Sequence, residues 1–344
     1  QVFMNIKNNL KAFLLKSISK KKNVDFNIKN SKKVLMLRYD RIGDMIITTP
    51  VFRELKKSYP NIEINVLASK SNHIILKNNP YISNIYINNR NNIFLNLLLL
   101  LRLRSQNFDV CFEFDHSVVR HAIIRLQIIN PKKVISVQKV GRYGVSASKL
   151  SIYKYYTDKL VDAHFRDIWL NTLNPFDIKI NSNHYDIFID SDYLDESKKY
   201  VMQFSDKFLV GINLKGAVKG KKIPFRELKE LCEGLYYINS SIQIVLITSP
   251  EHEKLIKSNI DRIGYSYISQ SYITKNILAA SALIKNLNMI ITPDTSITHI
   301  ASTFNKPVIT IHENNYDSYK LFAPTSDLNR TIFSKKINSL EGFS

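Results

Sequence analysis

Short apolar runs typical of strands alternate with helical stretches along most of this chain, and the alternating series occurs twice. The first series begins at Val34 and the second at Phe208, and a polar, irregular segment that opens at Asn174 precedes the second. Strands that alternate with helices favour βαβ units, in which helices cover both faces of a parallel sheet. We therefore predict an α/β fold of two Rossmann-like domains, with mainly parallel sheets that face a central cleft.

Hydrophobic periodicity and the turn residues between periodic segments give the expected elements. The first series is expected to contain helices at 45–59 and 158–173 and strands at 34–37, 62–67, 84–87, 108–114 and 133–137. The second is expected to contain strands at 208–214, 242–248, 289–291 and 308–311 and helices at 225–238, 251–260, 274–284 and 296–304. Because 344 residues suffice for two cores, we expect domains at 33–178 and 179–330, a basic extension at 1–32 and a tail at 331–344.

The chain is strongly basic, with 49 Lys and Arg against 29 Asp and Glu and a formal net charge of +20. Nine Lys and one Asp stand in the first 33 residues. This balance favours polyanionic partners, which include nucleic acid, anionic lipid headgroups and phosphorylated substrates. We find no RNA-binding module with aromatic side chains among basic ones, so we expect no nucleic acid partner. The basic extension is either a solvated segment or a helix on an anionic membrane surface.

Cysteine usage and hydropathy indicate the compartment. Cys111 and Cys232 lie far apart in the sequence, without a disulfide framework or zinc-ligand spacing, which favours a reducing environment. The most apolar stretch, 93–101, is far shorter than the roughly 20 residues of a membrane span. The N-terminal apolar patches are short and interleaved with Lys, unlike a signal peptide. We therefore expect a cytoplasmic protein that touches a membrane peripherally.

The first turn with chemical potential is 38–44, which ends the first strand and opens the first helix. Gly43 permits a tight turn and the close approach of a ligand. Asp44 falls at the helix start, where capping and the helix dipole favour a carboxylate. Helix capping alone would explain Asp44, but not the additional charges of Arg38, Asp40 and Arg41. The turn is not a dinucleotide fingerprint, because G-x-G-x-x-G is absent.

The second turn is a glycine- and lysine-rich loop, 211–224, between a strand and a helix. Its spacing from Gly216 to Gly220 is one residue too short for a P-loop, and Lys221 is followed by another Lys, which excludes the ATPase motif. Lysines before a helix N-terminus suit a phosphate. An exposed basic loop is the alternative for this cluster, which comprises Lys215, Lys219, Lys221 and Lys222.

The third and most specific turn is 292–301, where a buried strand runs into a hydroxyl-rich helix start. We expect the helix to begin near Thr295 with unpaired N–H groups and two hydroxyls, which can bind a pyrophosphate without a metal. Thr295 and His299 are spaced i, i+4 and are expected to share one helix face. The alternative is a helix cap with a histidine in the core.

Weaker candidates lie in the first series. Asp115 ends a strand at the ligand-binding edge, and Arg142 and Lys149 lie in a basic loop that can meet an anionic acceptor. A capping role for Asp115 and a solvated loop for the two cations are the alternatives.

Two segments carry a family resemblance. The first is Val34-Leu-Met-Leu-Arg-Tyr-Asp-Arg-Ile-Gly-Asp44, followed by Thr49-Pro50, and the second is Pro293-Asp-Thr-Ser-Ile-Thr-His299. Their order and separation match those of two motifs of a known enzyme family. From about residue 33 to 315 the chain resembles glycosyltransferase family 9, the ADP-heptose:lipopolysaccharide heptosyltransferases and their relatives. The resemblance implies a GT-B enzyme of a Gram-negative bacterium, with the acceptor on the N-terminal domain and the nucleotide sugar on the C-terminal one.

The resemblance also implies an inverting reaction and assigns roles to individual residues. Asp44 becomes the general base, and Arg41, Asp115, Arg142 and Lys149 are candidates for acceptor binding. Lys221 is expected on the leaving diphosphate, and the other donor-binding candidates are Gly216, Asp294, Thr295, Ser296 and His299. Ser296 stands where many members have Gly, and Gly216 stands where some have a hydroxyl residue. No cofactor or metal is expected; assistance by Mg²⁺ stays open as an alternative, although no sequence feature indicates it.

Three functions remain open. The first is transfer of heptose from ADP-heptose to the phosphorylated inner core of lipopolysaccharide, either Kdo-lipid A or heptose, at the inner membrane. The second keeps the family with a different nucleotide sugar or glycan acceptor. The third is a basic polyanion-binding protein without catalysis.

Overall fold

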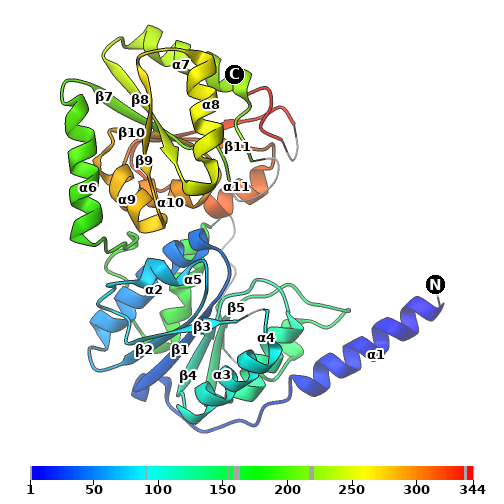
Figure 1. Ribbon diagram of the computed structural model, residues 1–344. Coiled ribbons are helices and arrows are strands. Elements are labelled where there is room, and N and C mark those ends of the chain that lie inside the picture. Colours follow the sequence, from blue (N-terminus) through cyan, green and yellow to red (C-terminus); the bar gives the residue numbers. More distant parts are fainter. Residues whose placement is uncertain are drawn as a thin grey trace. The chain divides into compact units, whose positions relative to one another are not determined.

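The computed structural model divides into two units, Gln1–Asn183 and His184–Ser344. It describes residues 2–89, 91–153, 155–157, 163–216, 221–336 and 339–343. The division falls a few residues after the expected boundary at 178/179. Each unit has its own core and its own parallel sheet, as the two alternating series require (Figure 1).

The sheet of unit 1 has six strands in the order β3-β2-β1-β4-β5-β6, all paired in parallel. Their bounds are β1 Lys33–Arg38, β2 Glu63–Ser69, β3 Asn84–Asn88, β4 Val110–Glu113, β5 Lys133–Val137 and β6 Tyr155–Thr157. This is the Rossmann order, whose direction reverses between β1 and β4. Ligands of such sheets bind where the carboxyl ends of those two strands diverge.

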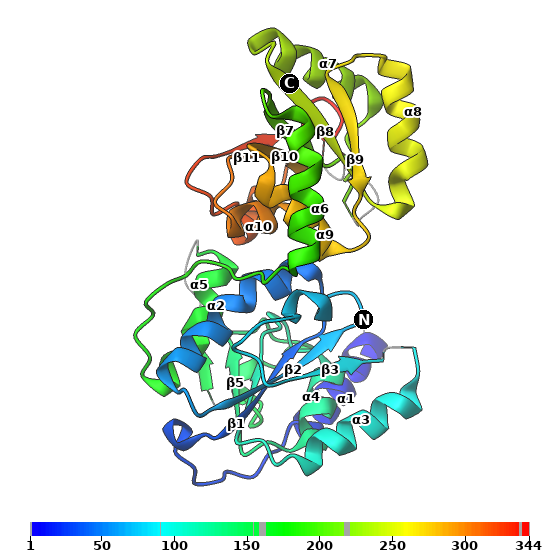
Figure 2. The ribbon, with the colours of Figure 1, turned by 60° about the vertical axis from the view of Figure 1, so that its left-hand side comes forward.

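Helices cover both faces of this sheet. They are α1 Val2–Ile18, α2 Ile42–Ser58, α3 Ile93–Ser105, α4 Arg120–Ile129 and α5 Phe165–Leu170. Helix α4 packs against both α1 and α3, and α2 packs against α5. Both ribbon views place α1, α3 and α4 together (Figures 1 and 2). Leu15 of α1 is fully buried in the core cluster that contains Leu103 and Leu126.

Unit 2 repeats the architecture with the order β12-β11-β10-β7-β8-β9. Read from the unit's own first strand, this is the same Rossmann order, and its reversal lies between β7 and β10. The strands are β7 Phe208–Ile212, β8 Ile242–Thr248, β9 Ile268–Ile273, β10 Met289–Pro293, β11 Val308–His312 and β12 Asn329–Phe333. The helices are α6 Ser191–Val201, α7 Phe225–Ile238, α8 Glu253–Ile263, α9 Ile277–Asn286, α10 Ser296–Thr303 and α11 Tyr316–Phe322.

The two Rossmann-like units with parallel sheets are confirmed, and three segments differ from expectation. The segment from 331 is not a tail, because β12 pairs with β11 and Leu340 is buried in the core of unit 2. The first 32 residues are not a separate extension, since Leu15 and Ile28 are buried in unit 1. Of the helix expected at 158–173, residues 158–162 lie outside the described residues, and α5 is shorter.

Candidate functional site

In unit 1, the charged turn 38–44 begins at the end of β1 and lies where the sheet order reverses. Arg38 is the last residue of β1 and is only 2% exposed. Its Nη1 lies 3.0 Å from Asp40 Oδ2, its Nη2 lies 3.8 Å from Asp44 Oδ1, and its Nε donates to the Asp44 carbonyl at 3.3 Å. The guanidinium carbon is 3.7 Å from the centre of the Trp169 ring. Two carboxylates and an aromatic face thus compensate a buried cation.

Asp44 is held as a helix-capping residue and still reaches solvent. It is the third residue of α2, and its Oδ2 accepts the N–H of Arg41 at 3.3 Å. The side chain keeps 15% of its surface exposed, and Arg41 is exposed. The capping alternative is therefore met in the structure. A carboxylate fixed in this way can also accept a proton from a bound hydroxyl.

Asp40 and Asp44 both contact the Arg38 guanidinium, and the surroundings of Asp40 disfavour its charged form. Burial raises the pKa of Asp40 to about 6, against the opposing effect of Arg38, and the nearby negative charges of Asp44 and Asp115 add to the rise. The carboxylates at positions 40, 44 and 115 therefore act on one another at the same end of the sheet.

The end of β4 carries a buried ion pair. Lys139 pairs with Glu113, and both side chains are almost completely buried. Burial raises the pKa of Glu113 to about 7 although Lys139 opposes the rise. Lys139 also donates to the carbonyl of Asp115, whose own N–H donates to Glu113 at 2.9 Å. The pair thus fixes the backbone of Asp115, which is half-buried beside the turn of β1.

The two basic candidates of the following loop are exposed. Arg142 donates from Nη1 to the carbonyl of Val118 at 3.3 Å, and its guanidinium lies 5.1 Å from the Tyr143 ring centre. Lys149 ends a 3₁₀ turn that starts at Ala147. Within the described residues, neither cation forms a hydrogen bond or an ion pair with Asp44.

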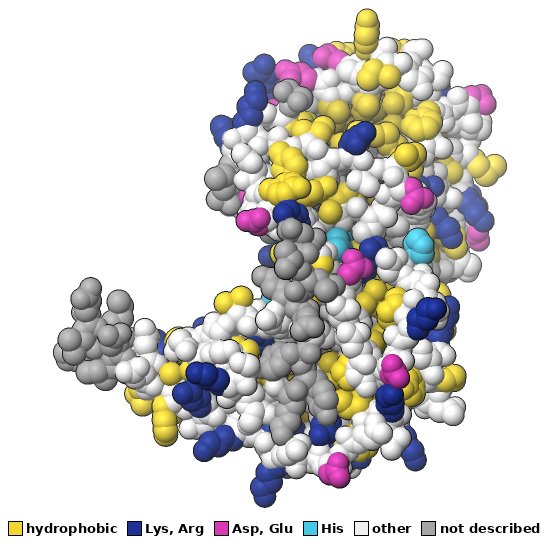
Figure 3. Space-filling model, turned by 180° about the vertical axis from the view of Figure 1, so that it is seen from behind, with side chains coloured by type: hydrophobic (Ala, Val, Ile, Leu, Met, Phe, Trp, Pro, Cys, Tyr) yellow, Lys and Arg dark blue, Asp and Glu magenta, His cyan; other side chains and the backbone are white. Residues whose placement is uncertain are grey.

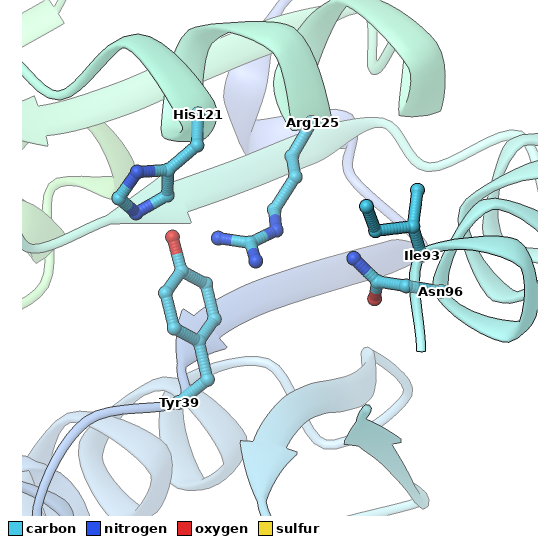
Figure 4. A pocket seen from close by; sticks show the side chains of 5 residues that line it. All are labelled: Tyr39, Ile93, Asn96, His121 and Arg125. Atoms are coloured by element: carbon cyan, nitrogen blue, oxygen red, sulfur yellow. The ribbon is translucent and has the colours of Figure 1, made fainter. Parts of the chain in front are cut away.

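A cavity of about 350 Å³ opens beside the same turn, between the C-terminal end of β1, the start of α3 and α4. Tyr39, Ile93, Asn96, His121 and Arg125 line it (Figure 4). The Arg125 guanidinium lies 4.4 Å from the centre of the Tyr39 ring. Its Nη1 and the Oδ1 of Asn96 are buried without a hydrogen-bond partner. A buried donor on a cation without a partner suits an anionic ligand.

In unit 2, the loop after β10 builds an ion-pair cluster around Asp294. Lys221 pairs with its carboxylate on one side, and His312 Nε2 lies 3.4 Å from Oδ1 on the other. Burial alone would raise the pKa of Asp294, but His312 and Lys221 outweigh it and hold the pKa below its usual range. Asp294 is therefore a negatively charged carboxylate at neutral pH.

Thr295 caps α10 and belongs to a hydroxyl network. Its Oγ1 accepts the N–H of Ile297 at 3.2 Å and lies 3.2 Å from the hydroxyl of Thr292. Asn213, just after β7, donates to both hydroxyls at 3.0 and 3.3 Å. Ser296 is the first residue of α10 and is half-buried. The start of α10 thus presents N–H groups and hydroxyls where β7 and β10 diverge, which suits a phosphate.

Gly216 brings the lysine loop onto this helix start. Its N–H donates to the Lys221 carbonyl at 2.6 Å, and Lys215 pairs with Lys222 in a short antiparallel bridge. A Cβ at position 216 would lie 2.9 Å from Thr295 Cγ2 and 3.0 Å from Lys221 Cβ. Glycine therefore permits this close approach. Lys219 lies outside the described residues.

His299 is buried, unlike the half-buried Asp294, Thr295 and Ser296. Its side chain is 3% exposed and packs against the rings of Tyr185 and Phe322. Thr295 is the N-cap with an extended backbone (φ −148°, ψ 176°), and α10 itself begins at Ser296. The burial agrees with the alternative, a histidine in the core.

Several residues of both sites could not be found from local sequence patterns. They are Trp169 and Lys139 in unit 1, Arg125 and His121 in the cavity, and Asn213 and His312 in unit 2. The one sequence signal for Asn213 and His312 is their position at the end of an apolar, strand-like run. Among the described residues, no group of three or more His, Cys, Asp or Glu is arranged to hold a metal ion.

Comparison with known proteins agrees with this architecture. The model of glycosyltransferase family 9 (heptosyltransferase) matches residues 98–341. Lipopolysaccharide heptosyltransferase 1 of Campylobacter coli is 23% identical over 292 residues, which cover 81% of this chain and 83% of that protein.

Solved structures show the fold. ADP-heptose LPS heptosyltransferase II of Escherichia coli has a TM-score of 0.66 and 16% identity, with 87% of this chain and 90% of that chain covered. The E. coli heptosyltransferase WaaC with ADP has a TM-score of 0.66 and 13% identity, with 90% and 95% covered. The fold is the GT-B fold of these enzymes.

Proposed function

Because the chain belongs to glycosyltransferase family 9, the heptosyltransferases, we propose that it transfers heptose from ADP-heptose to the inner core of lipopolysaccharide. The observation that carries the proposal is the anion site at the start of α10. There, helix N–H groups, the Thr295 hydroxyl and Lys221 converge where the sheet order of unit 2 reverses. This chemistry fits a nucleoside diphosphate.

Unit 2 holds the donor in this proposal. The diphosphate lies at the start of α10, against Ser296, Thr295 and the backbone near Gly216. Departure of ADP builds negative charge on the β-phosphate, which the helix N-terminus and Lys221 stabilise. The WaaC structure with ADP supports adenosine as the nucleoside. Asp294, with its lowered pKa, accepts hydrogen bonds from the sugar hydroxyls. His299 supports α10 from within the core.

Unit 1 supplies the base. The acceptor hydroxyl loses its proton to the Asp44 carboxylate while its oxygen forms a bond to the anomeric carbon of the donor. The bond from that carbon to the diphosphate oxygen breaks, and ADP departs with the electron pair. Attack opposite to the leaving group inverts the anomeric configuration. General-base catalysis of this kind contributes about 10²- to 10⁴-fold.

The acceptor is the phosphorylated inner core, Kdo-lipid A or heptose-bearing. The cavity next to the β1 turn supports this choice, since Arg125 has a buried Nη1 without a hydrogen-bond partner. Arg41, Asp115, Arg142 and Lys149 lie on the loops of unit 1 that a larger acceptor reaches. Because such an acceptor is anchored in lipid, the enzyme works peripherally on the cytoplasmic face of the inner membrane.

A transfer assay read by mass spectrometry tests the proposal. The protein is mixed with ADP-heptose and truncated Kdo-lipid A, beside an Asp44→Asn variant. Asp192→Asn, an exposed carboxylate in the first turn of α6, is the matched control. We expect a gain of one heptose with the wild type and the control. We expect its loss in Asp44→Asn, with ADP binding retained.

The other outcomes separate the alternatives. Binding of a different nucleotide sugar without a gain of heptose would keep the family reaction and replace the donor or acceptor. A protein that binds no nucleotide sugar would be a polyanion-binding protein, and the enzymatic proposal would be wrong.

A further inference from the structure

Helix α3 exposes a large apolar surface in unit 1. Leu100 and Leu103 face the core, yet the opposite side is also apolar. Ile93 is 85% and Phe94 69% exposed, and the remaining exposed residues of this side are Leu95, Leu97, Leu98 and Leu101. A helix that is apolar all round is normally buried. Contiguous exposed apolar surface of this kind marks an interaction site.

The neighbouring helices extend this surface. Helix α4, which packs against α3 on one side and α1 on the other, exposes Ile124. Helix α1 exposes Leu10, Phe13 and Leu14 while Leu15 anchors it in the core. In Figure 3, exposed hydrophobic side chains are visible on the described part of the helix at the left that carries the N-terminus. We call these exposed apolar residues of α1, α3 and α4 the apolar face.

The three helices that carry the apolar face have charges of one sign. The three helices contain seven Lys or Arg and no Asp or Glu. The outer helices of unit 2 differ, since α6, α7 and α8 each mix acidic and basic residues. Arg102 and Arg104 lie at the end of α3, and Lys16 lies at the end of α1, all of them exposed. Cations beside apolar side chains are the chemistry of a helix in the interface of an anionic bilayer.

We propose that the apolar face inserts into an anionic lipid bilayer and holds unit 1 on the membrane surface. No helix in the described part of the chain is long and apolar enough to cross a membrane. A second copy of the chain is a poorer occupant, because pairing two such faces would bring like charges together without acidic partners. Each cation near an anionic leaflet instead gains attraction.

The apolar face adjoins the cavity of unit 1, which suggests how a lipid-anchored acceptor reaches the cavity; this part of the inference rests on the proposed function. Ile93 belongs to the apolar face and also lines the cavity with Arg125 and Tyr39. Insertion of α3 would therefore bring the mouth of the cavity to the lipid headgroups. An acceptor anchored by its acyl chains could then place an anionic group beside Arg125 without leaving the bilayer.

Vesicle flotation tests the proposal. The full chain is mixed with phosphatidylcholine vesicles, with and without phosphatidylglycerol, at low and high salt. We expect binding that requires phosphatidylglycerol and weakens with salt. In a Phe13→Ser/Phe94→Ser/Leu98→Ser variant, binding should fall by at least about tenfold, because three large apolar groups no longer leave water. The matched control is Tyr237→Ser/Ile238→Ser, two exposed apolar residues at the end of α7.

The outcomes decide between the occupants. Equal flotation of the triple variant and the wild type, or an equal loss in the control, would overturn the proposal. The proposal would also be overturned if the wild type formed concentration-dependent dimers and the triple variant did not, since the apolar face would then bind a second copy of the chain. ADP binding and the far-ultraviolet circular dichroism spectrum verify that each variant folds. If the triple variant does not fold, the single variant Phe94→Ser takes its place in the flotation experiment. Flotation needs no sugar transfer, and transfer to a lipid-free acceptor needs no membrane, so each proposal can fail without the other.

Discussion

The guanidinium of Arg38 stacks on the indole of Trp169, with 3.7 Å between the guanidinium carbon and the ring centre. Arg38 comes from the first strand and Trp169 from α5, the last helix of unit 1. The ring lies against the same cation that contacts Asp40 and Asp44. Trp169 is thus a positioning residue for the proposed base, because it limits where Arg38 can hold the two carboxylates.

Replacing Trp169 tests this positioning role. We expect Trp169→Leu to lower kcat while leaving the ADP dissociation constant unchanged, since the ring contacts Arg38, His116 and Phe165 of unit 1 and the proposed ADP site belongs to unit 2. Trp169→Phe should retain more activity, because an aromatic face still attracts the cation by about 0.5–2 kcal/mol. Steady-state kinetics and calorimetry measure the two quantities. A parallel loss of ADP affinity would show that the substitution disturbs more than the base.

Asp40 should make stability depend on pH. Its pKa in the folded protein is raised to about 6, above the value of about 3.9 in an unfolded chain. Between these values the folded state binds more protons, so Asp40 makes stability fall as pH rises from about 4 to 6. Asp40→Asn removes this loss. We expect denaturant unfolding to show that the free energy of unfolding of the variant increases relative to that of the wild type as pH rises from about 4 to 6. A constant difference would contradict the raised pKa.

The ion pair between Lys139 and Glu113 should be costly to break. Lys139→Met leaves a buried carboxylate unpaired, which we expect to cost about 3–5 kcal/mol of unfolding free energy. Lys139→Met/Glu113→Gln removes both charges and should recover part of the loss. Urea unfolding of these two variants and of Glu113→Gln completes the double-mutant cycle and gives the coupling energy. A double variant less stable than the single one would show that the two side chains contribute separately.

Lys221 should contribute to donor binding and its neighbour should not. Lys221→Met removes a cation next to Asp294 at the start of α10. We expect the ADP dissociation constant to rise about 10- to 100-fold, as for loss of a hydrogen bond to a charged group. Lys222→Met, the exposed adjacent residue, is the control and should change affinity little. Calorimetric titration with ADP measures both. Equal effects would indicate a general electrostatic attraction.

Gly216→Ala should disturb the donor site because the added Cβ would lie 2.9 Å from Thr295 Cγ2. We expect weaker ADP binding as Thr295 or the loop shifts. Gly234→Ala in α7 is the matched control, since a Cβ there meets nothing within 4 Å. It should leave ADP binding unchanged and stabilise the helix by about 0.5–1 kcal/mol. ADP titration and thermal unfolding distinguish the two. Unchanged affinity in Gly216→Ala would place the loop outside the donor site.

The three turns were predictable from the sequence because each joins a hydrophobic run to a helix start. β5, α7 and β8 have the expected bounds, since their periodicity and flanking turn residues are clear. β9 and β12 were missed because polar residues interrupt them, and β6 because it has only three residues. Spacing alone did not reveal that His299 packs against Tyr185 and Phe322, because these partners lie far away in the sequence.

The sequence by itself determined the alternation of strands and helices, the excess of positive charge and the charged or hydroxyl-rich turns at strand ends. These are local properties, fixed by neighbouring residues and by hydrophobic period. Only the tertiary structure decided the partners: Trp169 on Arg38, Lys139 on Glu113, His312 on Asp294 and the cavity around Arg125. Crossovers in a parallel sheet bring together strand ends that lie far apart in the chain, and burial then sets which charges must pair.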